Sequence, residues 1–229
     1  MLENLKEQVF QANKMLPKLK LVKLTWGNVS GIDKSKGLVV IKPSGVEYDQ
    51  MTKDDMVVVD LNGNKVEGKL NPSSDLPTHL LLYKEFKDIG GVVHTHSKWA
   101  TIWAQAGYCL PAFGTTHADY FATEIPCSRP LTAKEISNEY EKQTGDIIVE
   151  TFKDYDYNNT PAVLVHSHGP FTWGKDPKSA VENSLVLEEV CKMGYYTTTL
   201  NQDKDMITTS LLNKHFYRKH GKNAYYGQK

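Results

Sequence analysis

The sequence contains little cysteine, with only three such residues in 229. Cys109, Cys127 and Cys191 are far apart, and no two of them have the C-x-x-C spacing of a zinc knuckle or a redox pair. This scarcity excludes a disulfide framework, because such frameworks need several paired cysteines. The pattern is typical of a reducing compartment, so we expect a cytoplasmic protein.

An excess of charge is also absent, since 27 Lys and Arg residues balance 27 Asp and Glu residues. A neutral chain sets up no long-range field that would concentrate nucleic acid or an anionic membrane. The N-terminus lacks the basic and apolar regions of a secretion signal, and no apolar run approaches the roughly 20 residues that span a bilayer. We therefore expect neither nucleic acid nor a membrane as a partner.

Repeats, linkers and low-complexity stretches are missing too, and 40% of the residues are apolar. This composition predicts one domain over residues 1–229. Apolar residues at three- and four-residue spacing predict a first helix that Pro17 ends, and Thr132 with Glu135 forms a capping box that begins a later one. Further helices are expected over 73–86, 98–107, 176–193 and 205–220. Strands are expected over 37–45, 91–97 and 161–169, with a hairpin over 56–68.

The predicted strands and helices alternate irregularly along the chain. This order predicts an α/β protein in which helices cover both faces of a mixed sheet. Residues 110–130 have the composition of a loop with short apolar pieces, and "TWGNVSG" also reads as a polar loop.

Two His-x-His pairs follow apolar strands, one in "VVHTHS" and one in "VLVHSHG". Side chains two residues apart on an extended strand point to the same side, so each pair projects together. Two such strand ends can converge on a zinc ion, which takes about four nitrogen, sulfur or oxygen donors. The plain alternative is a set of separately buried imidazoles. Spacing leaves open which histidine of the second pair is the ligand, since His166 and His168 both fit.

A carboxylate is needed to complete such a site, and Asp75 at a predicted helix start is the candidate; its plain alternative is a helix cap. Nearby, "KPSG" and "SSD" combine a lysine, hydroxyl groups, a flexible backbone and a helix N-terminus, all of which favour a phosphate group. An ordinary turn and an ordinary cap are the alternatives. The candidate substrate and phosphate residues are Asn28, Lys42, Ser44, Gly45, Ser73 and Ser74.

These segments occur in one order with several other unusual ones, including "LTWGNVSG", "TTHADYF" and the tail "KHGKNAYYGQ". Together they resemble the class II aldolase/epimerase family, which includes the adducin head domain, and most closely its epimerase branch. Class II aldolases commonly have Glu where this chain has Asp75, and this departure favours an epimerase. The resemblance implies a three-layer α/β/α class II aldolase-like fold with a largely antiparallel central sheet.

The resemblance also implies a site shared between subunits of a cyclic homotetramer, with the C-terminal tail contributing to a neighbouring active site. It implies one Zn²⁺ per subunit, with Mn²⁺ or Co²⁺ as possible substitutes. The implied metal ligands are Asp75, His94, His96 and His168. The implied acid/base residues are Asp119 and Tyr226, with Thr115 near the substrate. His166 is then a neighbour of the metal site, and His117 and His215 rank below the core set as residues that support substrate or interface contacts.

The activity implied by the resemblance is the interconversion of L-ribulose 5-phosphate and D-xylulose 5-phosphate, as in arabinose catabolism. The inverted carbon, C4, has no acidic C–H beside the carbonyl, so inversion requires cleavage and re-formation of the C3–C4 bond. The nearest alternative is a fuculose- or rhamnulose-phosphate aldolase that releases a free aldehyde. A zinc hydrolase and a noncatalytic scaffold resembling the adducin head are more distant alternatives.

Overall fold

A seven-stranded sheet forms the centre of the chain, for which a computed structural model describes residues 2–222 and 224–227. The strand order is β4-β3-β2-β1-β5-β7-β6, and every neighbouring pair is antiparallel. A mixed sheet was predicted, but among the described residues the only parallel pairing is one isolated bridge between Cys127 and Leu164. The strands are β1 Asn28–Asp33, β2 Leu38–Ile41, β3 Val57–Asp60, β4 Lys65–Glu67, β5 Gly91–His94, β6 Ala162–Val165 and β7 Gly169–Gly174.

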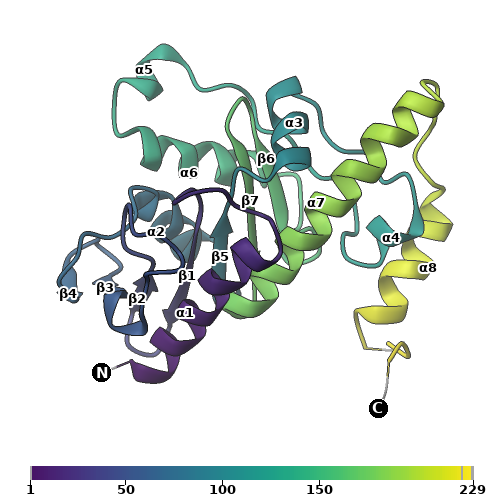
Figure 1. Cartoon of the computed structure of the whole chain (residues 1–229). Coiled ribbons are helices and arrows are strands. Elements are labelled where there is room, and N and C mark those ends of the chain that lie inside the picture. Colours follow the sequence, from purple (N-terminus) through teal and green to yellow (C-terminus); the bar gives the residue numbers. More distant parts are fainter. Residues whose placement is uncertain (1, 223, 228–229) are drawn as a thin grey trace.

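Helices lie on both faces of this sheet (Figure 1), which confirms the predicted α/β fold of three layers. Helices α1 and α7 cover one face, and α2 and α6 cover the other, while α4 and α8 lie together beside α7. A 3₁₀ turn, η1, spans Lys53–Asp55. The helices are α1 Glu3–Lys18, α2 Leu76–Glu85, α3 Lys98–Ala106, α4 Thr115–Ala118, α5 Ala133–Ile136, α6 Tyr140–Thr151, α7 Pro177–Leu200 and α8 Thr209–Lys219.

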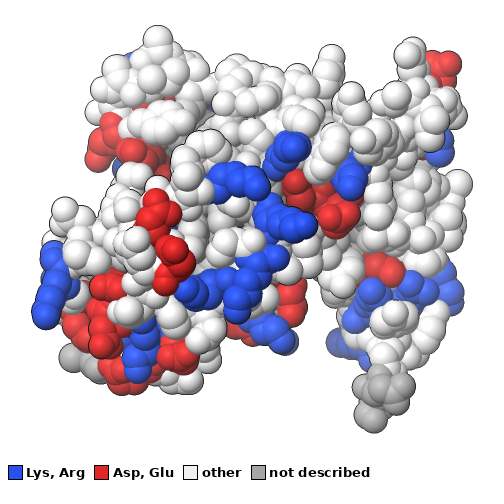
Figure 2. Space-filling model, viewed as in Figure 1, with Lys and Arg blue, Asp and Glu red and all other residues white. Residues whose placement is uncertain are grey.

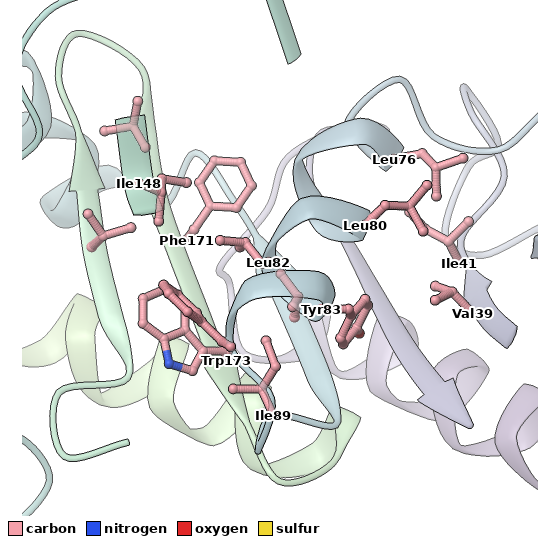
Figure 3. Packing of buried hydrophobic residues seen from close by; sticks show 14 of the residues in the cluster. Val39, Ile41, Leu76, Leu80, Leu82, Tyr83, Ile89, Ile148, Phe171 and Trp173 are labelled. Atoms are coloured by element: carbon pink, nitrogen blue, oxygen red, sulfur yellow. The ribbon is translucent and has the colours of Figure 1, made fainter. Parts of the chain in front are cut away.

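Alternating side chains of the strands fill the two cores of the molecule. In β2, Val39 and Ile41 pack toward α2 and α6, whereas Val40 packs toward α1 and α7. Figure 3 shows the first core, where Leu82 of α2 lies near Phe171 of β7. Full burial of such a side chain stabilises the fold by about 1.5–3 kcal/mol, so the strand pattern itself fixes which face each helix covers.

The sequence did not predict two of the strands, β1 and β7, which are interior strands on either side of β5. β1 contains Asn28, which was expected in a loop, and β7 contains Gly169 and Pro170. These residue types are depleted in strands, so propensity argued against both elements. Pairing with β5 on either side supplies the hydrogen bonds that override this local preference.

Several helix boundaries also differ from the predictions, and α8, for example, begins at Thr209 instead of at residue 205. The capping box of Thr132 and Glu135 is present, but it begins the short α5, and Glu139 in the left-handed region (φ 48°) separates this turn from α6. Helix α7 continues to Leu200 instead of stopping near Met193. Helix α1 continues one residue past Pro17. None of the described helices combines the length and apolarity that a membrane crossing requires.

Candidate metal centre and substrate cavity

Three histidines meet where β5 ends and where the turn between β6 and β7 passes beside it. His94 is the last residue of β5 and pairs with Phe171 of β7, so the residues just before β7 are brought to the end of β5. The possible ligand atoms of His94, His96 and His168 all lie within 4.8 Å of one another. The structure therefore brings together three of the four predicted metal ligands.

The orientation of these rings suits a cation. Nδ1–H of His94 donates to the Pro170 carbonyl at 3.0 Å, which leaves its Nε2 with a lone pair. This Nε2 lies 3.1 Å from Nε2 of His96. In the part of the chain that is described, Nδ1 of His168 is buried without a hydrogen-bond partner. Three imidazoles therefore converge, and one buried nitrogen among them has no hydrogen-bond partner. This arrangement fits a metal ion, because nitrogens that each lie about 2 Å from one zinc ion must lie close to one another.

The environment of His96 and His168 favours the neutral imidazole, the form that binds metal. Burial, together with the neighbouring His94 and His96, lowers the pKa of His168 to about 3. The pKa of His96 is lowered by the same causes, burial first and His94 second. The ring of His94 stacks on Phe171 with 4.2 Å between centroids, which fixes its plane.

His166 does not join this group, so the prediction that His166 and His168 point to the same side is wrong. β6 ends at Val165, and Ser167 adopts a left-handed conformation with φ 59°. The resulting turn directs His166 toward Gly107, where a Cβ atom would lie 2.7 Å from its Nε2. Nδ1 of His166 is 2.9 Å from the Ser167 hydroxyl.

Asp75 lines the same cavity as the three histidines. It does not belong to the group whose ligand atoms all lie within 4.8 Å of one another. It occupies the N-cap position of α2, yet its side chain accepts no capping bond from the described backbone. Instead Oδ2 accepts a hydrogen bond from Nδ2 of Asn28 at 2.6 Å. Burial raises the pKa of Asp75, but the electrostatic interactions with His94 and His79 and the Asn28 bond outweigh it and keep the pKa below its usual value. The carboxylate is thus ionised next to the metal centre.

One cavity of about 570 Å³ contains the histidine group and the predicted phosphate-binding loops. The two loops are joined through their backbones, since Ser44 N–H donates to Asn71 O and Ser73 N–H donates to Lys42 O, each at 3.0 Å. This pairing explains how motifs about 30 residues apart line the same space. The predicted substrate and phosphate residues that line it are Asn28, Lys42, Ser44, Gly45, Ser73 and Ser74.

Lys42 holds the loop of residues 42–46 through a hydrogen bond to its backbone. It is only 2% exposed, and its ammonium donates to Val46 O at 2.8 Å and lies 4.9 Å from the centre of the Tyr48 ring. Burial lowers its pKa to about 8, against an opposing effect of Glu47. Gly45 has φ 67° and no atom within 4 Å of the position of a Cβ, so the loop is open on the side where a phosphate would enter.

Asn28 and Trp26 line the same cavity next to the metal centre. Nδ2 of Asn28 donates to Ser73 Oγ at 2.9 Å as well as to Asp75, while its Oδ1 is buried without a partner among the described residues. That oxygen is available to accept a bond from a substrate hydroxyl. Trp26, which the sequence analysis did not single out, is 50% exposed and its ring lies 6.1 Å from that of His96.

The predicted acid/base residues lie elsewhere, together with each other. Neither Asp119 nor Tyr226 lines the metal cavity formed by the described residues, and Thr115, the first residue of α4, does not line it either. Asp119 follows α4, and its carboxylate binds Arg218 of α8. The Tyr226 ring lies 5.0 Å from the Arg218 guanidinium. A single chain thus holds the predicted metal ligands and the predicted acid/base residues in two separate places.

Hydrogen bonds from α8 determine the ionisation of Asp119. Burial raises its pKa, but bonds from Arg218, His215 and Lys219 outweigh it and lower the pKa below the usual value. His117 differs, because it is buried, its pKa is lowered to about 4 by burial, and its Nε2 donates to Thr123 O at 2.7 Å. It lines a separate cavity of about 270 Å³.

The sequence profile of the Class II Aldolase and Adducin N-terminal domain matches residues 7–195, so the chain belongs to this family. A solved L-fuculose 1-phosphate aldolase is 25% identical, with a TM-score of 0.80 over 94% of this chain and 95% of the other. YgbL from Klebsiella pneumoniae, described as a putative aldolase/epimerase/decarboxylase, is 20% identical with a TM-score of 0.72, over 93% of this chain and 99% of the other. L-fuculose 1-phosphate aldolase from Glaciozyma antarctica PI12 is 18% identical with a TM-score of 0.77, over 97% of this chain and 84% of the other.

The predicted family is therefore confirmed. The last two structures support the shared fold alone. The relatives are named as aldolases or as members of a mixed group, so they do not separate the epimerase branch from the aldolases.

Proposed function

We propose that this protein is a metal-dependent L-ribulose-5-phosphate 4-epimerase, with Zn²⁺ as its cation and Mn²⁺ or Co²⁺ as possible substitutes. The observation that carries the proposal is the single cavity in which the three histidines adjoin the two paired loops. A ligand with a phosphate at one end and adjacent oxygen atoms at the other fits this arrangement. We also propose that residues 1–229 form one domain and that it works in the cytoplasm, where the three free cysteines would stay reduced.

The proposed reaction begins when a base removes the proton of the C4 hydroxyl. C4 and its oxygen become an aldehyde group as the C3–C4 bond breaks. The electron pair of that bond moves toward C3 and the C2 carbonyl. A divalent cation at the histidine group supplies Lewis acidity for the negative charge that develops on the substrate oxygens. Rotation of the aldehyde and re-formation of the bond then give the opposite configuration at C4.

The two paired loops have the task of keeping the phosphate in place during this rotation. The hydroxyls of Ser44, Ser73 and Ser74 and the backbone N–H groups of Gly45 and Ser74 suit a dianion, and the fragment that carries the phosphate must not leave. Oδ1 of Asn28, which has no partner among the described residues, would accept a bond from a hydroxyl near the metal. These contacts favour recombination over release.

Proton transfer at the C4 oxygen is assigned to Asp119 and Tyr226. Because the cavity that the described residues form does not include them, we propose that they act in the cavity of a second copy, within a homotetramer. Exposed apolar side chains on the C-terminal half of α7 support contact between copies. They include Met193, Tyr195, Tyr196 and Leu200.

A class II sugar-phosphate aldolase is the second candidate, because the 25% identical structure is named as an L-fuculose 1-phosphate aldolase. Asp75 favours the epimerase, since the aldolases that the sequence resembles commonly have the longer Glu there. The two activities differ in what happens to the cleaved fragments, which leave an aldolase but stay in an epimerase.

The test is to incubate the zinc-loaded protein with L-ribulose 5-phosphate in the presence of a hydrazine that traps free aldehydes. We expect D-xylulose 5-phosphate to form without a stoichiometric hydrazone of glycolaldehyde phosphate. Accumulation of that hydrazone, with no xylulose product, would show an aldolase and would contradict the epimerase assignment.

A further inference from the structure

Arg218 contacts both members of the proposed acid/base pair. Its Nε donates to Oδ1 of Asp119 at 3.0 Å, and its Nη2 donates to Oδ2 at 2.7 Å. The Tyr226 ring lies across the same guanidinium, 5.0 Å from Cζ. The sequence analysis did not single out Arg218, because nothing local in "HFYRKHG" links it to residues near position 119.

We propose that Arg218 is the positioning residue of the proton-transfer pair, orienting the Asp119 carboxylate through both of its oxygens and the Tyr226 ring through its planar face. The inference rests on the proposed function, since it concerns the groups that would move the C4 proton. Arg218 itself takes no proton, because a guanidinium remains charged in proteins.

The geometry of the contact distinguishes Arg218 from its neighbours. A planar fork that binds both carboxylate oxygens fixes orientation as well as charge, whereas a single ammonium acts as a point charge. Lys219 also lies over the Tyr226 ring, 4.6 Å from its centre, but it reaches only Oδ2 of Asp119, at 3.3 Å. His215 reaches only Oδ1, at 3.0 Å. Asp119 is 14% exposed and Arg218 25% exposed, so solvent screens this pair less than an ordinary surface pair.

The backbone of Arg218 holds the tail as well. Its carbonyl accepts hydrogen bonds from the N–H groups of Tyr225 and Tyr226, both at 3.0 Å. The chain therefore folds back at Gly221, where φ is 93°, and the tail returns to the end of α8. One residue thus connects Asp119 and the tail tyrosine through three kinds of contact: the forked ion pair, the stacked ring and the shared carbonyl.

The groups that face Asp119 come from α8 and from the residues that follow it. Besides Arg218 they are His215 and Lys219, while Nε2 of His220 lies 3.0 Å from the Asp119 carbonyl. Figure 2 shows Lys and Arg gathered on the lobe of α4 and α8, with a small acidic area among them. Loss of Arg218 would leave these other groups in place but would remove the forked contact that binds both carboxylate oxygens at once.

The experiment compares Arg218→Gln, which removes the charge and the fork, with Arg218→Lys, which keeps the charge alone. Lys214→Gln is the matched control, because Lys214 also lies over a tail tyrosine, 5.3 Å from the Tyr225 ring centre, on the same helix. Steady-state kinetics on L-ribulose 5-phosphate are measured from pH 5 to 10 below the melting temperature of each variant, with zinc content checked.

For Arg218→Gln we expect kcat to fall at least about tenfold with little change in KM, and the acidic limb of the kcat profile to move to higher pH. The direction follows because removing a cation raises the pKa of the Asp119 carboxyl. Arg218→Lys should keep the acidic limb near that of the wild type, but kcat should still fall. Lys214→Gln should resemble the wild type.

A kcat and an acidic limb that are unchanged in Arg218→Gln would overturn the inference. So would a lower melting temperature and a lower kcat without any shift of the limb, because that result describes a purely structural residue.

A wild-type protein that fails to convert L-ribulose 5-phosphate would refute the proposed function instead. The inference is then decided by carbon-13 NMR of labelled Asp carboxyls, with Asp119→Asn providing the assignment. If the Asp119 carboxyl titrates at higher pH in Arg218→Gln than in the wild type, the result supports the inference. If it titrates at the same pH in both proteins, the result overturns the inference.

Discussion

At the scale of single residues, the histidine pairs show both the reach and the limit of sequence reasoning. His94 and His96 could be predicted as partners, because His94 ends a strand and His96 is two residues further on. The choice between His166 and His168 could not be made from spacing, which assumed an extended chain. It depends on the left-handed Ser167, and a positive φ at a serine has no clear signature in a single sequence.

This difference gives a matched pair of substitutions. His168→Gln should lower zinc affinity at least about tenfold, since one of three converging imidazoles is lost. His166→Gln should retain one zinc per chain, because that ring faces Gly107. Metal analysis after dialysis against a weak chelator makes the comparison. Equal zinc content in the two variants would contradict the arrangement of the site.

Lys42 gives a prediction about pH. Its pKa is lowered to about 8 in the folded protein, whereas an unfolded chain has the ordinary value near 10.5. Between these values the unfolded state binds more protons, so stability rises with pH through this window, by at most about 1.4 kcal/mol per pH unit. Lys42→Met should lack this rise. Chemical denaturation of both proteins between pH 7 and 10 measures it, and parallel curves would show that burial does not perturb the amine.

At the scale of elements, the sequence predicted the regular helices and the apolar strands but not β1 and β7. Their glycine, proline and asparagine residues argue against strands locally, yet both strands pair with β5 and place Asn28 and the turn before β7 beside His94. The site could therefore be guessed from its motifs, while the elements that assemble it required tertiary pairing.

Gly91 is where β5 meets the start of α7 at close range. A Cβ there would lie 2.5 Å from Asp176 O and 2.5 Å from Pro177 N, which are backbone atoms that cannot easily move. Gly91→Ala should thus lower the free energy of unfolding by roughly 1–3 kcal/mol. Gly114→Ala is the control, because no atom lies within 4 Å of its added Cβ. Urea denaturation that gives equal values for both variants would refute this packing.

At the scale of the whole molecule, the important feature is the separation between the candidate metal cavity and the predicted acid/base residues. The metal cavity is built at one end of the sheet, while Asp119 and Tyr226 lie on the lobe of α4 and α8 beside α7 (Figure 1). No local pattern in the sequence indicates this separation. Only the resemblance to the family suggested that the tail serves a neighbouring subunit.

Mixing two inactive variants tests whether sites are shared between copies. His96→Asn keeps the acid/base residues, and Asp119→Asn keeps the metal ligands. If subunits exchange and sites lie between copies, about a quarter of the sites regain both halves in an equal mixture. The measurement is epimerase activity after the two proteins are co-refolded. Activity that stays at the level of the single variants would place both halves in one subunit.

The most direct test of the account is conversion of L-ribulose 5-phosphate by one protein preparation in three states: as purified, stripped by a chelator, and restored with one equivalent of zinc per chain. We predict that D-xylulose 5-phosphate forms in the first and third states and that nearly none forms in the second. Circular dichroism should show that the fold is retained in all three states. Conversion that continues at an unchanged rate in the stripped protein, or that is absent from the folded, zinc-loaded protein, would contradict the central claim.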